Sequence, residues 1–98
     1  MDHARLQHFE VAVVAARGVA RRAEEHANEC ARIRNLLLAD IHQTERINRP
    51  VTDEQRAALA KAEAEFAQAC AERNAANAAV NSAGETLNNC TAYVARMK

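Results

Sequence analysis

The residues best suited to chemistry in this chain are one histidine and two cysteines, His26, Cys30 and Cys70. Imidazole nitrogen and thiolate sulfur are common zinc ligands, and two thiols that meet can form a disulfide. His26 and Cys30 share a face if their segment is helical. A zinc site needs a fourth ligand, and no Cys-x-x-Cys or His-Glu-x-x-His pattern supplies one. We expect no metal and no cofactor. A metal- or redox-responsive switch, and a Cys30–Cys70 disulfide, remain open alternatives.

Other kinds of chemistry have weaker support. No nucleophile, base and orienting residue can be identified from the spacing, and there is no glycine-rich phosphate loop. Thirteen basic and thirteen acidic residues give a formal net charge of zero. The one local basic patch is followed at once by acidic residues, which disfavours nucleic-acid binding; it consists of Arg17, Arg21 and Arg22. We therefore expect no enzymatic activity and no nucleic-acid partner.

No stretch approaches the roughly 20 apolar residues that span a membrane. The apolar run from Val11 to Ala16 is closed by arginines on the wrong side for a secretory signal. We therefore expect no membrane association and a cytoplasmic location. Arginine outnumbers lysine and alanine is abundant, which suggests a GC-rich coding sequence of bacterial or phage origin.

Helices must position these side chains, because apolar residues recur three and four positions apart through both halves of the chain. Sustained spacing of this kind forms the seam of a coiled coil. In the first half the seam consists of Leu6, Phe9, Val13, Ala16, Ala20, Ala23, Ala27, Cys30, Arg34, Leu37 and Ile41. In the second it consists of Leu59, Ala62, Phe66, Ala69, Arg73, Ala76, Val80, Ala83, Leu87, Cys90, Val94 and Met97.

Pro50 separates the two helical patterns. Proline disfavours helical geometry at the preceding residue and donates no backbone hydrogen bond. We predict one domain over residues 1–98, with a helix at about 4–48, a turn at 48–51 and a second helix at about 53–96. Thr52 and Gln55 form a capping box that starts the second helix, and residues 82–85 offer a kink. The fold class is all-α: a long antiparallel two-helix hairpin, in which residue i faces about residue 100 minus i.

Alanine supplies about half of the hydrophobic residues, so the seam of a lone hairpin buries little apolar area. We therefore expect a second copy to complete a four-helix bundle. Apolar residues off the seam are the predicted self-association surface: Val11, Val14, Ile33 and Leu36 from the first helix, and Ala57, Ala60, Ala64, Ala67 and Ala71 from the second.

A polar, uncharged stripe follows on the second helix. Side-chain amides both donate and accept hydrogen bonds, which suits recognition of a protein partner. The stripe consists of Asn74, Asn77, Asn81 and Asn88, with Gly84 among them.

Arg34 and Arg73 each interrupt the seam. We expect the aliphatic part of each side chain to pack in the seam while its guanidinium reaches a nearby carboxylate.

The hypothesis for function is a non-enzymatic interaction module that self-associates and binds a protein, such as a small assembly, adaptor or inhibitor protein. A secreted hairpin is the alternative, because in length and shape the chain resembles the WXG100 secretion substrates. That family carries Trp-x-Gly at its turn, where this chain has Asn48-Arg49-Pro50-Val51.

Overall fold

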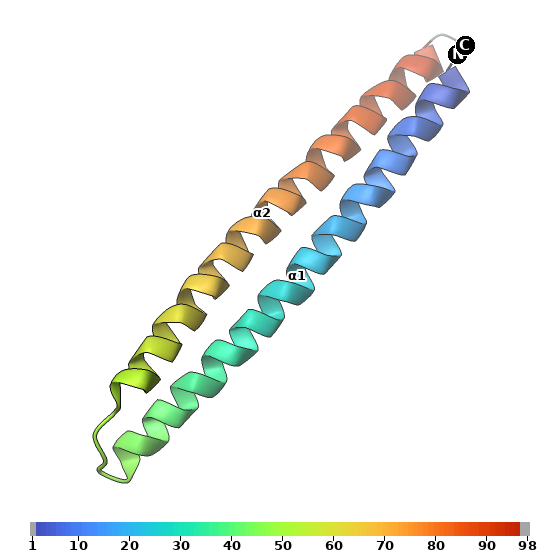
Figure 1. Cartoon of the computed structure of the whole chain (residues 1–98). Helices are drawn as coiled ribbons and strands as arrows, with labels where there is room; N and C mark the ends of the chain where they lie inside the picture. Colours follow the sequence, from blue (N-terminus) through green and yellow to red (C-terminus); the bar gives the residue numbers. More distant parts are fainter. Residues whose placement is uncertain (1, 97–98) are drawn as a thin grey trace.

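The computed structural model is a hairpin of two long helices that lie side by side (Figure 1). Helix α1 spans Asp2–Arg46 and helix α2 spans Asp53–Arg96. The structure describes residues 2–96, with side chains from residue 4, and the rod measures 75 × 15 × 13 Å. The start of α1 and the end of α2 lie at the same end of the rod. The antiparallel helical hairpin expected from the sequence is confirmed.

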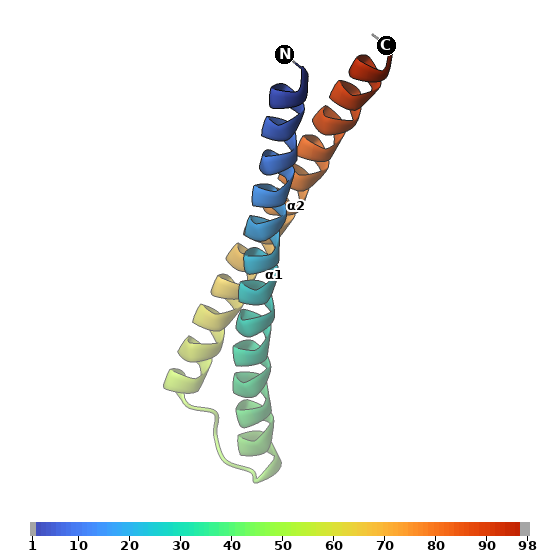
Figure 2. The same ribbon diagram turned by 90° about the vertical axis from the view of Figure 1, so that its right-hand side faces the viewer.

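The helices cross, as the view turned by 90° shows (Figure 2). Crossing brings helix axes closest near the middle and separates them toward the ends, as in other packed helix pairs. The tightest packing is accordingly found among small residues in the middle of each helix, where Ala27 is 1% exposed and Ala69 is 0% exposed. Cys30 lies between them, and Phe66 packs against this cluster.

The predicted seam is the buried face of both helices. Every seam residue from Leu6 to Ile41 and from Leu59 to Val94 is buried or half-buried, while Met97 lies outside the described residues. The guanidinium of Arg34 lies 4.4 Å from the centre of the Phe66 ring, a pairing that agrees with the predicted register. Among the described residues no large side chain is fully buried. The core is therefore a thin line of small residues.

Helix α1 ends at Arg46, earlier than the predicted end at about Asn48. The amide of Asn48 donates to the carbonyl of Glu45 at 3.0 Å, and that of Arg49 donates to Thr44 at 3.1 Å. Asn48 has a φ of 57°. These bonds form a Schellman motif, in which asparagine is one of the few residues besides glycine that tolerates the left-handed conformation. The helix is thus closed by Asn48 before Pro50 is reached.

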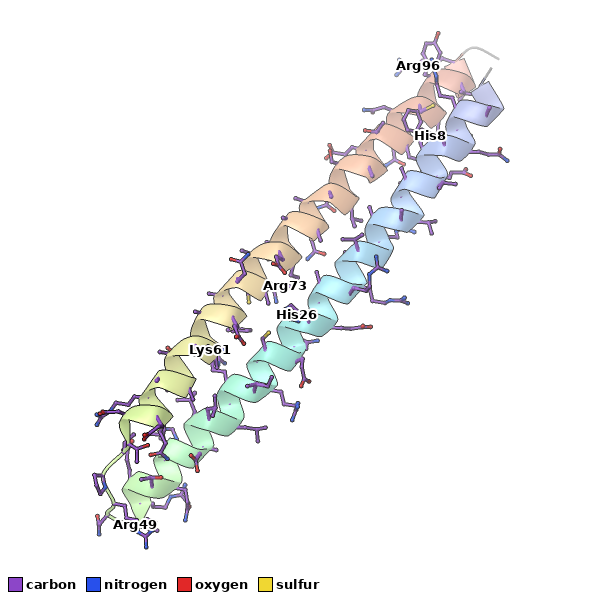
Figure 3. The ribbon with its side chains drawn as sticks, viewed as in Figure 1. His8, His26, Arg49, Lys61, Arg73 and Arg96 are labelled. Atoms are coloured by element: carbon purple, nitrogen blue, oxygen red, sulfur yellow. The ribbon has the colours of Figure 1, made fainter. Side chains whose placement is uncertain are left out.

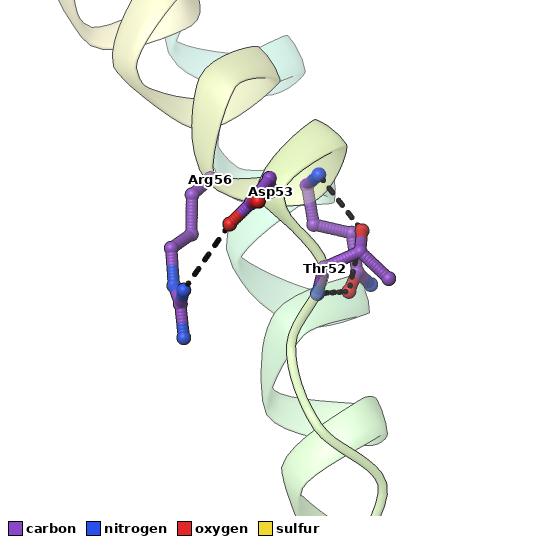
Figure 4. Close-up of polar contacts among 4 residues, drawn as sticks. Thr52, Asp53 and Arg56 are labelled. Carbon is purple, nitrogen blue, oxygen red and sulfur yellow. Dashed lines mark hydrogen bonds and ion pairs between the residues drawn. The ribbon is translucent and has the colours of Figure 1, made fainter.

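The capping box of α2 is confirmed (Figure 4). The amide of Gln55 donates to Thr52 Oγ1 at 3.1 Å, and the amide of Thr52 donates to Gln55 Oε1 at 2.9 Å. The Gln55 side chain also donates across the turn to Asp40 Oδ2 and to Thr44 Oγ1, both at 2.9 Å. Gln55 therefore caps its own helix and joins it to the end of α1.

The kink allowed at residues 82–85 is not observed, because α2 continues unbroken through this segment. The seam residues on either side of the segment, Val80 and Leu87, and Ala83 within it, are half-buried. A Cβ placed on Gly84 would meet nothing within 4 Å, so the glycine marks an open position on the helix surface. The helix and its seam positions thus continue where the local sequence alone permits a break.

We expect Gln55→Ala to lower the free energy of unfolding by about 1–2 kcal/mol, since it removes the capping bond and both bonds across the turn. Urea denaturation followed by circular dichroism measures this change. Gln68→Ala is the matched control, because Gln68 is exposed and bonds only to Glu72 on its own helix. Equal effects of the two substitutions would contradict the joining role of Gln55.

Candidate functional site

The thiols and the imidazole do not converge on one site. Cys30 is buried in the core, Cys70 and Cys90 are half-buried, and all three are free thiols. His26 Nε2 lies 3.8 Å from Cys30 Sγ. Within residues 4–96, no three His, Cys, Asp or Glu side chains group closely enough to hold a metal ion.

Cys70 and His26 diverge because they flank the seam on different sides. Cys70 follows the core residue Ala69, whereas His26 precedes the core residue Ala27. In an antiparallel pair these two flanks point to opposite sides of the hairpin. The Cys30–Cys70 disulfide left open by the sequence is absent, and the three residues of the proposed switch are not brought together.

The seam arginines pack as expected, but their heads do not reach carboxylates. Arg34 and Arg73 are both half-buried, and each donates to the asparagine that follows it. Over the described residues neither one forms an ion pair; the two ion pairs found there are Arg32–Glu29 and Arg56–Asp53. Arg34 stacks on Phe66 instead of turning outward to an acid, since a guanidinium interacts favourably with an aromatic face.

The Arg32–Glu29 pair lies on the surface of α1. Arg32 Nη2 donates to Glu29 Oε1 at 2.6 Å, and Arg32 Nε donates to Glu29 Oε2 at 3.1 Å. This two-pronged hydrogen bond lowers the pKa of the Glu29 carboxyl and raises the pKa of the Arg32 guanidinium. Both side chains are more than half exposed, so solvent screens the pair and it adds little to stability.

The asparagine stripe is exposed along the half of α2 nearer the chain termini. Gly84 among them is half-buried. Asn74 accepts a hydrogen bond from Arg73 at 3.4 Å. No hydrogen bond joins the side chains of Asn77, Asn81 or Asn88 to other described residues, so their amides face solvent. The structure thus places the four predicted partner-binding residues together on one helix surface.

The predicted self-association residues are also exposed, but they fall on different sides of the rod. Val11 and Val14 are 67% exposed, and each lines a shallow outer groove of α1. The stripe Ala57, Ala60, Ala64, Ala67 and Ala71 faces outward from α2. Residues opposite the seam on two paired helices point away from each other. These two sets therefore form separate surfaces.

Ile33 and Leu36 lie instead beside the seam, 39% and 57% exposed. The exposed large hydrophobic residues include three that the predicted self-association set does not contain: Val19, Ile47 and Tyr93. Val19, Ile33 and Ile47 occupy the same position in the repeat, fourteen residues apart. This regularity is visible in the sequence.

A groove at the open end of the hairpin is lined by residues from both helices: Arg5, Phe9, Thr86, Cys90, Tyr93 and Val94. Its seam residues are Phe9, Cys90 and Val94, and the others flank the seam. A second groove lies midway along the rod and is lined by His26, Cys30, Lys61, Ala64, Glu65 and Gln68. The second groove includes the Cys30 thiol and the His26 imidazole, 3.8 Å apart, but no other described side chain hydrogen-bonds to His26 to orient it. Both grooves fit contact with apolar side chains.

The chain matches no protein family, no characterised protein and no solved structure. Across the described residues, neither helix is both long and apolar enough to cross a bilayer. The candidate sites therefore rest on the geometry of the hairpin itself.

We expect Ala69→Leu to lower the free energy of unfolding by about 1–3 kcal/mol, since a larger side chain at this fully buried position forces the helices apart. Ala67→Leu, two residues away and exposed, is the control, and we expect it to change stability by less than about 0.5 kcal/mol. Chemical denaturation of both variants measures the difference. If Ala69→Leu were tolerated as well as Ala67→Leu, the close packing at the middle of the seam would be refuted.

Proposed function

We propose that this chain is a non-enzymatic helical interaction module that self-associates, completes a four-helix bundle and binds a protein partner. A small bacterial or phage assembly, adaptor or inhibitor protein fits this description. The observation that carries the proposal is the large apolar surface that one hairpin leaves uncovered.

The exposed area supports self-association quantitatively. A compact monomer of 10.8 kDa exposes about 5,500 Å². This hairpin exposes 7255 Å², an excess of about 1,700 Å² over a compact monomer. A dimer that covered this excess on both copies would have an interface within the roughly 2,000–5,000 Å² typical of permanent homodimers. A second copy is thus enough to cover the excess surface that each hairpin exposes.

The asparagine stripe supports a role in binding a different protein. Asn77, Asn81 and Asn88 present amides with no hydrogen bond to the rest of the described chain, and Gly84 beside them leaves room for close approach. An uncharged side-chain amide can both donate hydrogen bonds to a partner and accept them from it. The stripe therefore suits a specific polar contact better than it suits an apolar helix interface.

An enzymatic role has no comparable support. The grooves are shallow, and within the part of the chain that the structure describes the paired titratable groups with a perturbed pKa, Glu29 and Arg32, are exposed on a helix surface. Catalytic groups generally need a water-excluding pocket. Binding is the function that this geometry favours.

We expect the purified chain to elute from a size-exclusion column as a helical particle of twice the chain mass or more by light scattering. The reason is the area that a lone hairpin leaves exposed. Circular dichroism on the same peak establishes that the particle is folded. A folded, stable monomer at micromolar concentration would overturn self-association.

A second experiment tests the stripe. We expect the double substitution Asn77→Lys with Asn81→Lys to abolish capture of the partner from host extract while leaving helicity and oligomeric mass unchanged. Gln7→Lys with Asn28→Lys is the matched control, since both residues are exposed on the other helix, α1, and line neither of the grooves between the helices. Quantitative mass spectrometry compares the three baits. A partner that binds all three equally does not use the asparagine stripe, and loss of every captured protein from the control would also contradict the assignment.

A further inference from the structure

The hairpin gathers one flank of each helix onto a single side of the rod. In the repeat, one flanking position directly precedes every second seam residue. It is filled by Arg5, Ala12, Val19, His26, Ile33 and Asp40 in α1, by Ile47 directly after α1 ends, and by Ala58, Glu65, Glu72, Ala79, Thr86 and Tyr93 in α2. The lining of the grooves shows that these flanks meet. Arg5 shares one groove with Thr86 and Tyr93, and His26 shares another with Glu65. We call this side, which also includes the residues three after or four before each flanking position (Arg22 and Leu36 in α1, and Lys61 and Arg96 in α2, are examples), the flank face.

The flank face carries most of the exposed large hydrophobic residues. Five of the seven lie on it, namely Val19, Ile33, Leu36, Ile47 and Tyr93, and they are between 39% and 57% exposed. Val11 and Val14 lie on the outer surface of α1, and the asparagine stripe lies on the other side of the seam. Four of these residues come from the part of the chain between Val19 and Ile47, and Tyr93 comes from α2. Apolar residues placed at intervals along one side of a helix pair are of the kind that another pair of helices covers.

Charges on the flank face are sorted by position along the rod. In the half nearer the chain termini the charged residues are Arg5, Arg22 and Arg96, with no acidic residue among the described positions of the face. In the half nearer the turn the acidic residues are Glu29, Asp40, Glu54, Glu65 and Glu72, opposed by a single base, Lys61. Figure 3 labels Arg96 near the open end and Lys61 in the half toward the turn. The face thus has a basic half and an acidic half.

We propose that the flank face is covered by a second copy of this chain in the antiparallel orientation, with the turn of each hairpin over the chain termini of the other. The proposal rests on the self-association proposed above and specifies its face and its direction. Two identical faces can meet about a twofold axis that runs along the rod or across it. The axis along the rod sets like charges over like, whereas the axis across it sets the basic half over the acidic half of the partner. Charge complementarity therefore selects the second arrangement.

The same arrangement accounts for the groove at the open end. An antiparallel partner brings its own turn over that groove, whose walls include Phe9, Cys90 and Val94. Ile47 is the exposed apolar residue at the turn end of the flank face, 51% exposed. Its side chain has the size and the position to enter the groove of the partner. Each end of the rod then covers apolar surface that the hairpin alone leaves open.

Amine crosslinking measures the orientation directly. Lys61 and Arg96 lie on one helix, separated by about 52 Å of helix rise, beyond the reach of a short amine-reactive reagent within one chain. In a fully overlapped antiparallel dimer, Lys61 of one chain and Arg96 of the other lie about 10 Å apart along the axis, whereas the two Lys61 residues lie about 40 Å apart. In a parallel dimer the two Lys61 residues lie at the same level along the axis, and Lys61 of one chain lies about 52 Å along the axis from Arg96 of the other.

The experiment uses the full chain carrying Arg96→Lys, mixed from isotopically light and heavy protein so that links between chains are identified by mass. We expect a dimer in which Lys61 is linked to the amine introduced by Arg96→Lys on the other chain. A dimer that gives links between the two Lys61 residues, or that lacks the Lys61 link to position 96, overturns the antiparallel arrangement and leaves self-association intact. A monomer by light scattering overturns the self-association on which the proposal rests.

Charge reversal provides an independent test of the face. We expect Glu65→Lys with Glu72→Lys to weaken dimerisation about tenfold or more at low salt, because each reversal acts twice across a twofold axis, and this loss to shrink as salt is added. Glu45→Lys with Glu63→Lys is the matched control, since these exposed acids lie on the opposite side of the seam in the same half of the rod. Analytical ultracentrifugation measures both dissociation constants. Equal weakening by the two variants would overturn the assignment of the flank face.

Discussion

The close contact of small residues at the middle of the seam is the constraint on which the rest of the molecule depends. Ala27 and Ala69 are almost wholly buried where the two helices pack together. Small residues at a helix contact allow this approach but contribute little apolar area each. The hairpin therefore gains a well-defined crossing point and a thin core, and its larger apolar side chains remain at the ends and on the surface.

The turn, together with this contact, sets the register in which the two helices pair. Asn48 closes α1 in the left-handed conformation, and Gln55 both caps α2 and bonds across the turn to Asp40 and Thr44. With the connection fixed at one end and the alanine contact fixed in the middle, the helices have little freedom to slide. Because the chain reverses direction at the turn, the residues that precede seam positions lie on the same side of the rod in both helices. The turn therefore determines which surface residues are neighbours.

Two sides of the rod acquire different characters as a result. One side carries five of the seven exposed large hydrophobic residues found in the described chain, with bases toward one end and acids toward the other, while the opposite side carries the asparagine stripe. The proposed self-association uses the first side, and the proposed contact with a different protein uses the second. The rod is narrow, 15 by 13 Å in section, so these two surfaces lie close to each other.

The sequence by itself determined the helices, the seam and the start of α2, because these depend on spacing along the chain and on local hydrogen bonds. Seam positions read from periodicity alone are buried or half-buried throughout the described residues, and the Thr52–Gln55 box forms as predicted. The end of α1 at Arg46 was harder to predict from the sequence. It depends on Asn48 adopting a left-handed conformation, which the spacing of apolar residues does not indicate.

Only the tertiary structure decided which side chains face one another across the two helices. That Arg34 stacks on Phe66 instead of reaching an acid, and that Cys30 and Cys70 do not pair, depends on side-chain conformation and on the distance between the helices, which the spacing of residues along the chain does not specify. The grouping of Val19, Ile33, Ile47 and Tyr93 on one side depends in addition on the antiparallel pairing of the helices. Spacing within a helix is a local property, whereas the pairing of flanks between helices exists only after the chain has turned back on itself.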